Sequence, residues 1–558
     1  MLDKMWTFIT AVLALSLGIS ATPFRRGNIS PPTAHVKNGT YEGVHSTEYD
    51  QDFFLGVPFA QPPVDDLRFR LPQSLNTTWE GPRDAKDYSL LCVGYGLDQT
   101  FYEQSEDCLY LNVVRPAGYD HEKLPVAFWI HGGGFSNGGG GDQRYNLSFI
   151  VEQSVRIGKP IIGVSINYRL SVWGFLHSNE VVGEGVTNLG LRDQRLALHW
   201  VQENIAAFGG DPKKVTIFGE SAGAASVGFQ LTAYGGRDDK LFRAAILQSG
   251  NPIFYGAENG TQRSQASFEA IVSQVGCSDS WDRLQCLREV PFLTLNATYN
   301  TISGSFSPTI DGDFIRTYGS QQLRNGQFVN VPIITGANSD EGASMSPTGI
   351  NTTEDFKATL STFLPASFQD AILEAYPDDL SVNVVASLGN QRPAPSYGAQ
   401  FRRSASFWGD YYFIASRRQT AKTWAAHGIP AYAYRFNAIP AGVPPEIGVG
   451  HYKEIGFMFK NLQGVGYRPD ILPFEGKGQN YIELADLMSS TWVSFVYDLD
   501  PSNYTGRNSS IPAWPQYDVH DPRDFVFDAN VTSYVEADTY RAVGIALIND
   551  NAAEVLHR

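Results

Sequence analysis

The stretch from 215 to 225 constrains the fold of this chain more than any other. It opens with the apolar and β-branched run Val215–Phe218 and continues as Gly219-Glu-Ser-Ala-Gly223, followed by further small residues. A buried strand, a sharp Gly-x-Ser-x-Gly turn and a helix start, in that order, form a nucleophile elbow. Glycines at both ends of the turn avoid collisions in a strained backbone that projects the serine hydroxyl away from the sheet. The pattern predicts Ser221 as a nucleophile, although five residues of this form also occur by chance in strand–helix turns.

From Leu109 onward, short apolar runs alternate with helical patterns. Apolar strands separated by helices predict an α/β fold, with a central, mostly parallel sheet covered by helices on both faces. Residues 24–90 are rich in Pro, Gly and short alternating runs, and we expect them to form a β-rich N-terminal segment. No repeat or clean linker divides the chain, so residues 22–558 are predicted to form one domain. The expected strands are 124–130, 161–166, 215–218, 244–247, 331–334 and 429–434, and the clearest helices are 192–208 and 480–497.

The N-terminus has the pattern of a targeting segment. Lys4 supplies a positive charge, the stretch 6–17 is almost entirely apolar, and the small residues Ser20 and Ala21 follow. This run is too short to cross a bilayer comfortably, so residues 1–21 are predicted to be a cleaved signal peptide, with an uncleaved signal anchor as the alternative. We therefore expect the protein to be secreted or to reside in the lumen of the secretory pathway.

Cysteines and glycosylation sequons agree with secretion. The four cysteines fall into two close pairs, Cys92 with Cys108 and Cys277 with Cys286. Four cysteines allow three pairings, of which local pairing is favoured. A metal site is disfavoured because there is no Cys-x-x-Cys and no nearby histidine. Asn-x-Ser/Thr sequons, which mark candidate glycosylation sites, occur at Asn28, Asn38, Asn76, Asn146, Asn259, Asn296, Asn351, Asn503, Asn508 and Asn530.

The charge of the chain limits its partners. A net charge of −16 argues against nucleic acid or an anionic membrane as a partner. After the N-terminal segment, no stretch is long and apolar enough to predict stable insertion into a membrane. The oligomeric state cannot be read from these features.

A serine nucleophile needs an acid that orients its base. On a fold with a nucleophile elbow, the chain order should be Ser, acid, His, and these groups should follow the carboxyl ends of strands. Downstream of Ser221, the candidate acids are Asp311 and the pair Asp340-Glu341. The pair directly follows the strand expected at 331–334.

Position also selects the base. His451 lies in a glycine-rich loop shortly after the strand expected at 429–434. Its spacing to Glu454 could suggest a metal pair, but no third ligand is apparent, so no metal is predicted. The remaining downstream histidines are placed less well for a base. They are His427 at an expected helix end, His520 in a polar loop and His557 beside the C-terminus.

The strand expected at 124–130 runs into the loop His131-Gly-Gly-Gly-Phe135. Loops of this type supply backbone N–H groups to the oxyanion in lipases and esterases. Glycine lets those donors approach the substrate oxygen. The alternative is a merely flexible glycine-rich loop, which the second glycine run, 138–141, would support.

Taken together, these motifs resemble the type-B carboxylesterase/lipase family, which includes cholinesterases and fungal lipases of the α/β-hydrolase fold. The resemblance covers nearly the whole chain after the N-terminal segment. The stretches that carry it are Glu106–Asn112, Asn167–Phe175, Asn188–Gln194, Phe208–Pro212 and Phe218–Ala224.

The resemblance implies hydrolysis of a small-molecule carboxylic ester through an acyl-enzyme, without a cofactor. It implies that the acid is Glu341 rather than Asp340, because the family places a Glu in an Asp-Glu-Gly context. It also implies backbone donors and supporting side chains around Ser221 and His451. The implied oxyanion donors are Gly133, Gly134 and Ala222, and the supporting side chains are Glu220 and Ser249.

The loop between Cys92 and Cys108 bears on the substrate. In family lipases this loop forms a lid, and in cholinesterases it carries a choline-binding tryptophan, whereas here it has only fifteen residues and no tryptophan. This favours a carboxylesterase with an open site. The alternatives are a lipase acting on long-chain glycerides, a dedicated esterase or acyltransferase of a secondary-metabolite pathway, and, more distantly, a non-catalytic adhesion-like binding protein.

Overall fold

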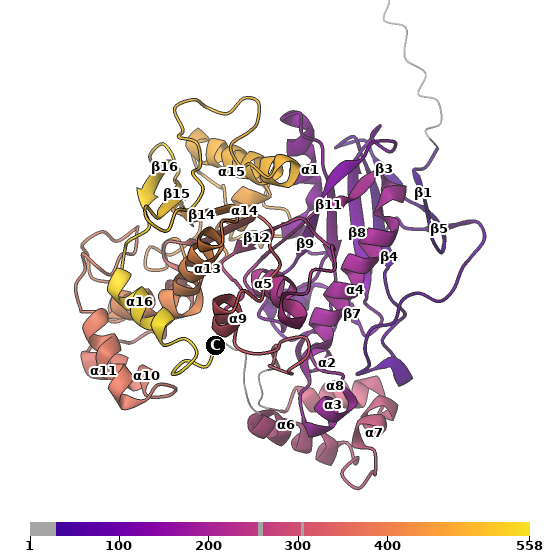
Figure 1. The fold of residues 1–558 in the computed structure, drawn as a ribbon, viewed down its shortest axis with the longest axis horizontal. Coiled ribbons are helices and arrows are strands. Elements are labelled where there is room, and N and C mark those ends of the chain that lie inside the picture. Colours follow the sequence, from indigo (N-terminus) through magenta and orange to yellow (C-terminus); the bar gives the residue numbers. More distant parts are fainter. Residues whose placement is uncertain (1–29, 255–260, 303–305) are drawn as a thin grey trace, which may run out of the picture. The chain divides into compact units, whose positions relative to one another are not determined.

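The computed structural model describes residues 30–254, 261–302 and 306–558 (Figure 1). The predicted signal peptide 1–21 and the sequons at Asn28 and Asn259 lie outside these residues. Pro32–Arg558 forms one compact unit, and the boundary of the predicted domain at residue 22 stays a prediction.

A mixed sheet of eleven strands, counted over the described residues, runs through this unit. Seven neighbouring strands, from β10 through β9 and β11 to β15, form a parallel block, and antiparallel strands flank it on both edges. The predicted mostly parallel sheet is therefore confirmed. In spatial order the strands are β16 (Tyr534–Ala537), β15 (Arg523–Phe527), β14 (Ala431–Phe436), β13 (Ile333–Asn338), β12 (Ala244–Gln248), β11 (Gly210–Glu220), β9 (Leu124–Ile130), β10 (Ile162–Ile166), β8 (Tyr110–Pro116), β4 (Gln51–Pro58) and β3 (Val44–Ser46).

The N-terminal part is β-rich, as predicted. It adds two small sheets to the edge strands of the large one. These are β1 (Thr33–Val36), β2 (Gly39–Glu42) and β5 (Pro82–Asp84) in one sheet, and β6 (Leu91–Cys92) with β7 (Gln104–Ser105) in the other.

Helices cover both faces of the large sheet (Figure 1). Side chains of α4, α5 and α13 belong to the core on one face, and those of α1, α14 and α15 to the core on the other. The α-helices are α1 (Leu147–Arg156), α2 (Ser171–Phe175), α3 (Asn179–Glu184), α4 (Leu189–Asn204), α5 (Ala222–Gly236, with non-helical backbone at 233–235), α6 (Thr261–Gln274), α7 (Arg283–Glu289), α8 (Phe292–Tyr299), α9 (Gly319–Arg324), α10 (Thr353–Leu360), α11 (Ala366–Ala375), α12 (Phe401–Gly409), α13 (Ala415–Ala426), α14 (Ile455–Met458), α15 (Gln479–Asp498) and α16 (Ala542–Asp550).

Shorter helical turns join these elements. A π-helical turn, Asp410–Ile414, lies between α12 and α13. None of the helices within the described ranges is long and apolar enough to cross a membrane. The 3₁₀ turns are Asp65–Leu67, Leu97–Phe101, Gln143–Tyr145, Ile205–Phe208 and Glu341–Ser344.

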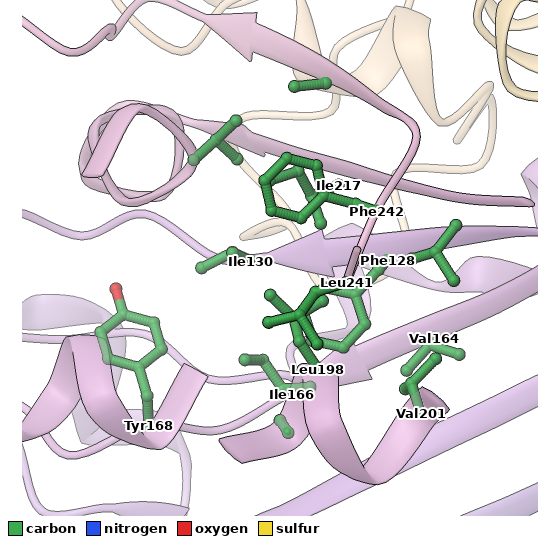
Figure 2. Packing of buried hydrophobic residues seen from close by; sticks show 14 of the residues in the cluster. Phe128, Ile130, Val164, Ile166, Tyr168, Leu198, Val201, Ile217, Leu241 and Phe242 are labelled. Carbon is green, nitrogen blue, oxygen red and sulfur yellow. The ribbon is translucent and has the colours of Figure 1, made fainter. Parts of the chain in front are cut away.

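Strand β9 shows why the sheet is buried on both faces. Successive side chains of a strand point to opposite sides. Phe128 and Ile130 pack on the α4 side, near Leu198 (Figure 2), whereas Trp129 packs on the other side, edge-on to Phe459 at a centroid distance of 5.0 Å. Fully burying each such side chain contributes about 1.5–3 kcal/mol. The strand that leads into the predicted oxyanion loop is therefore fixed from both sides.

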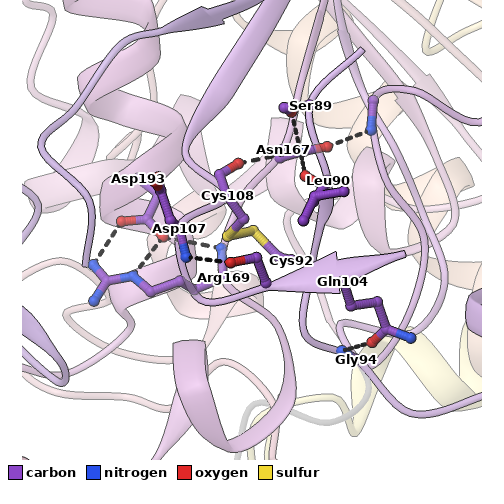
Figure 3. Close-up of a disulfide and its surroundings, with 12 residues drawn as sticks. Ser89, Leu90, Cys92, Gly94, Gln104, Asp107, Cys108, Asn167, Arg169 and Asp193 are labelled. Carbon is purple, nitrogen blue, oxygen red and sulfur yellow. Dashed lines mark hydrogen bonds and ion pairs between the residues drawn. A yellow bond between two sulfur atoms is a disulfide. The ribbon is translucent and has the colours of Figure 1, made fainter. Parts of the chain in front are cut away.

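The two predicted disulfides, Cys92–Cys108 and Cys277–Cys286, are both present. Around the first of them, Asn167 Nδ2 donates to the carbonyl of Cys108 at 3.1 Å (Figure 3). This hydrogen bond holds the disulfide loop against the end of β10.

Candidate active site

Ser221 lies between β11 and α5, at the apex of a sharp turn. Its backbone has φ 56° and ψ −123°, and its N–H donates to the carbonyl of Gln248 at 2.9 Å. A positive φ is uncommon for a residue other than glycine and marks local strain. The turn thus presents Ser221 at the carboxyl end of the parallel sheet.

The two glycines of the motif are sterically required. A Cβ on Gly223 would lie 2.1 Å from the carbonyl oxygen of Ile130, and one on Gly219 would lie 2.5 Å from the carbonyl carbon of Gly223. Helix α5 therefore starts in direct backbone contact with the end of β9. Any larger residue would push the serine out of place.

The chain brings the three predicted triad residues together. His451 Nε2 lies 2.8 Å from Ser221 Oγ, and His451 Nδ1 lies 2.7 Å from Glu341 Oε2. Each of the three follows a different strand of the parallel block: Ser221 follows β11, Glu341 follows β13 and His451 follows β14. Two hydrogen bonds to opposite nitrogens of one imidazole are the arrangement in which a base is oriented by an acid and bonded to a nucleophile.

Glu341 is held by three hydrogen bonds. Besides His451, its carboxylate accepts the N–H of Asn338 at 2.7 Å and a short hydrogen bond from the hydroxyl of Ser249. Asp311, the other candidate acid, instead accepts hydrogen bonds from Thr187 and Asn188, away from the imidazole. Of these two candidate acids, Glu341 is the one that contacts the imidazole.

Buried carboxylates set the electrostatics of the imidazole. Glu220 Oε1 lies 3.2 Å from His451 Nε2. Burial alone would lower the pKa of His451, but Glu220 and Glu341 outweigh it and raise that pKa to about 9. Burial also raises the pKa of Glu220 well above its ordinary value. The site is thus built to favour a positive charge on the imidazole.

The predicted oxyanion loop lies beside Ser221. A Cβ on Gly132 would be 3.2 Å from Cβ of Ser221, and Gly133 and Gly134 have φ values of 92° and 62°. The carbonyl of Gly133 accepts the N–H groups of residues 136 and 137, which closes a tight turn. Within the described part of the chain, no hydrogen bond engages the N–H of Gly133, Gly134 or Ala222.

His131, which precedes the glycines, has a structural role. Its ring stacks on Tyr168 at a centroid distance of 4.4 Å, and its Nδ1 lies 2.9 Å from the carbonyl of Gly132. Burial lowers its pKa to about 4, so it is neutral. The ring fixes the start of the loop.

Sequence reasoning missed several residues around the triad. Asp340, rejected as the acid, accepts the N–H of Val449 at 2.8 Å and so holds the loop that carries His451. Glu454, considered only as half of a metal pair, accepts from Asn338 Nδ2 at 2.8 Å. The adjacency of Asp340 to the acid was the one available signal, because the other contacts depend on tertiary structure.

A small pocket opens beside Ser221. Its wall is largely aromatic and aliphatic, with Ile253, Phe254, Tyr412 and Phe413 among its residues. A larger cavity lies among residues of α15 and the segment 504–533, and none of the predicted triad or oxyanion residues lines it.

The sequons within the described residues differ in exposure. Asn38, Asn146 and Asn296 are half-buried, and glycosylation at any of them stays a prediction. The exposed ones are Asn76, Asn351, Asn503, Asn508 and Asn530.

The parallel sheet, the elbow and the Ser–His–acid geometry define a protein of the α/β-hydrolase class. Residues 30–542 match the model of the Carboxylesterase family. The chain therefore belongs to this family and is a carboxylic ester hydrolase.

Comparison with individual proteins agrees with this family assignment. The chain is 37% identical over 536 residues to "Secreted lipase 1" of Botryotinia fuckeliana, covering 88% of this chain and 87% of that protein. It is 34% identical over 549 residues to "Lipase 2" of Geotrichum candidum, covering 89% and 91%. The crystal structure of Aspergillus niger EstA superposes with a TM-score of 0.81 at 28% identity, over 94% of this chain and 98% of that one.

Proposed function

We propose that this protein is a secreted serine carboxylesterase that acts through Ser221, His451 and Glu341. The observation that carries the proposal is the pair of hydrogen bonds on one imidazole, 2.8 Å to Ser221 Oγ and 2.7 Å to Glu341 Oε2. No cofactor enters the reaction.

Acylation uses the imidazole as a proton shuttle. His451 Nε2 takes the hydroxyl proton of Ser221 as Oγ attacks the ester carbonyl, and Glu341 stabilises the resulting imidazolium. Collapse of the tetrahedral intermediate breaks the bond to the alkoxide, which receives the proton from His451 and leaves as an alcohol. Water then attacks the acyl-enzyme with His451 as base, and the carboxylic acid and Ser221 are released.

The oxyanion of each intermediate would be held by backbone donors. The N–H groups of Gly133, Gly134 and Ala222 are the candidates, because they lie beside Ser221 and are not engaged elsewhere in the described chain. Each such donor contributes about 3 kcal/mol to the transition state. Ser249 and Glu220 support the site by bonding the acid and facing the base, respectively.

We propose soluble esters with short acyl chains as the preferred substrates. The pocket beside Ser221 is small, and Phe254, Tyr412 and Phe413 line part of its wall. The short loop between the first two cysteines also favours an open site over one beneath a large lid.

A lipase activity is the second candidate, and a specific feature favours it. Leu97 and Phe101, on the disulfide loop, are 81% and 72% exposed. This loop packs on the oxyanion loop, where the N–H of Tyr95 donates to the carbonyl of Ser136 at 2.7 Å. Two large apolar side chains at this position could contact a lipid surface, and the relatives named above are lipases.

Three features support the proposal that the protein is secreted. The N-terminal apolar segment has the composition of a signal peptide, the chain has two disulfides, and one relative is named a secreted lipase. Expression in the native host, followed by N-terminal sequencing of protein from the medium, would test this. A mature protein that starts near residue 22 is expected.

The activity is tested by release of p-nitrophenol from acetate, butyrate, octanoate and palmitate esters. The comparison is between wild type, Ser221→Ala and Ser346→Ala, a hydroxyl deletion whose partner is Ser404 rather than the triad. We expect the rate of hydrolysis to be highest for the short-chain esters, and we expect activity to be lost in Ser221→Ala but kept in Ser346→Ala. If the rate is highest with the palmitate ester, and increases further once the ester concentration exceeds its solubility, the protein is a lipase instead. Full activity in Ser221→Ala would refute the proposed nucleophile.

A further inference from the structure

A π-helical turn lies beside the candidate active site. Helix α12 ends at Gly409, the turn occupies Asp410–Ile414, and α13 continues directly from Ala415. Single π turns inside α-helices are rare and often occur at functional sites. Here the turn places Tyr412 and Phe413 in the wall of the cavity that contains Ser221.

Phe413 covers one face of the candidate base. Its ring and the imidazole of His451 are stacked, with centroids 4.4 Å apart and an interplanar angle of 12°. Phe413 is only 4% exposed. The π turn therefore places the ring of Phe413 in contact with the imidazole and in the wall of the cavity.

The turn is fixed to the segment that carries the acid. A Cβ on Gly342 would lie 2.0 Å from the carbonyl oxygen of Ala405 and 2.2 Å from the nitrogen of Gly409. Helix α12 thus packs by backbone contact on the 3₁₀ turn that begins at Glu341. From the same turn, Ser344 Oγ accepts the backbone N–H of His451 at 3.1 Å.

A second contact ties the π turn to the far side of the cavity. Ser416 Oγ donates to the carbonyl of Phe413 at 3.2 Å and accepts from Asn251 Nδ2 at 2.7 Å. Asn251 itself lines the cavity. The position of the Phe413 backbone is therefore determined from both sides.

We propose that Phe413 is a positioning residue, whose ring keeps the His451 imidazole in the plane of its two hydrogen bonds and stabilises its positively charged form. The catalytic meaning of this proposal rests on the function proposed above.

Two physical effects of the Phe413 ring on the imidazole support this role. Rotation of the imidazole about its bond to Cβ would break the hydrogen bonds at both nitrogens, and a stacked ring obstructs that rotation. A cation within about 6 Å of an aromatic centroid is also attracted to the ring face, and buried examples are the strongest. An aliphatic side chain of similar size would obstruct the rotation but would not attract the charge.

The test compares Phe413→Leu with Phe413→Tyr. Leucine keeps the site apolar and removes the ring, whereas tyrosine keeps the ring. Phe407→Leu is the control, because Phe407 is buried in the same helical segment and stacks on Tyr411 rather than on the imidazole. For each, the pH profile of kcat/KM for a short p-nitrophenyl ester is measured.

We expect the acid limb of Phe413→Leu to move to lower pH by about half to one unit, since the charged imidazole loses an attractive partner. The carboxylates that face His451, namely Glu220, Glu341 and Glu454, are unchanged in this variant. The profiles of Phe413→Tyr and Phe407→Leu should coincide with that of the wild type. If the limb of folded Phe413→Leu does not move, the proposal is wrong.

A second measurement does not depend on turnover. The downfield proton signal of the His451 Nδ1–H, which is bonded to Glu341, titrates with the imidazole in wild type and variants. A midpoint lowered in Phe413→Leu but not in Phe407→Leu supports the proposal even if no ester is hydrolysed, and equal midpoints overturn it. If Phe413→Leu does not fold, Phe413→Met is read in the same way. Inactive wild type with a shifted midpoint would instead count against the proposed function alone.

Discussion

Replacing Glu220 by glutamine is the sharpest electrostatic test of the site. The substitution keeps the size and shape of a side chain that is only 1% exposed, and it removes the carboxylate that lies 3.2 Å from His451 Nε2. The hydrogen bond from the imidazole to Glu341 is left intact. Any change in the titration of the base therefore reports the charge.

The magnitude follows from the distance. Two unit charges 3.2 Å apart attract by about 5 kcal/mol at an effective dielectric constant of about 20. Burial raises the pKa of Glu220, which disfavours its charged form and weakens this attraction. We therefore expect the variant to lose about 1.4–2.8 kcal/mol of this attraction, which is about one to two pH units.

The sign is set by the reaction. His451 must be neutral to take the proton of Ser221, so activity rises as pH passes the pKa of about 9 that the carboxylates impose. Without the Glu220 charge that pKa falls, and the acid limb of kcat/KM should move to lower pH by the amount above. The plateau should fall about tenfold because the imidazolium of the transition state loses a partner. The measurement is a pH–rate profile of both enzymes with one ester, with matching far-UV circular dichroism as the folding control. If the acid limb of the kcat/KM profile lies at the same pH in both enzymes, the electrostatic role of Glu220 is refuted.

Three further variants test other parts of the structure. Ser249→Ala removes a hydrogen bond to a buried carboxylate, worth about 1.5–3 kcal/mol, so kcat/KM should fall about ten- to a hundredfold in steady-state assays; an unchanged value would contradict the role of that bond. Gly223→Ala places a Cβ 2.1 Å from the carbonyl of Ile130, and a loss of several kcal/mol, seen as a lower thermal midpoint, is expected; an unchanged midpoint would show that the elbow can relax. Replacing Cys277 and Cys286 together by serine opens a small loop of sequence separation 9 and should cost about 2.5 kcal/mol in denaturant unfolding, with activity at low temperature retained.

The candidate triad could be predicted because chain order and strand ends are properties of the sequence. Ser221 is marked by the glycines that its turn requires, and His451 by its place after a strand in a glycine-rich loop. A glycine-rich loop after a strand also led to the prediction that Gly133 and Gly134 are oxyanion donors, which stays a prediction. Local pattern also accounted for His427, whose Nδ1 lies 2.8 Å from the carbonyl of Thr423 at the end of α13.

Strand boundaries were less predictable. The strand expected at 331–334 is observed at Ile333–Asn338, because Pro332 has no N–H to donate to a ladder. The edge strand Tyr534–Ala537 and its neighbour Arg523–Phe527 were not predicted, since they are short and lie among polar residues. Edge strands are defined by their partners more than by their own periodicity.

Tertiary contacts of the site were the least predictable. Asp340 looked like a rival acid, yet it holds the backbone before His451. The π turn at Asp410–Ile414 has no sequence signature, because the segment reads as an uninterrupted helix. Its contact with the imidazole exists only once the strand ends have been brought together.

The central claim is that Ser221 is a nucleophile activated by His451. The most direct measurement is covalent labelling with a fluorophosphonate, followed by mass spectrometry of the intact protein and its peptides. We expect one adduct per chain on the peptide that contains Ser221, no adduct in Ser221→Ala, and much slower labelling in His451→Gln. An active enzyme that is labelled elsewhere, or that is labelled equally fast without the imidazole, would contradict it.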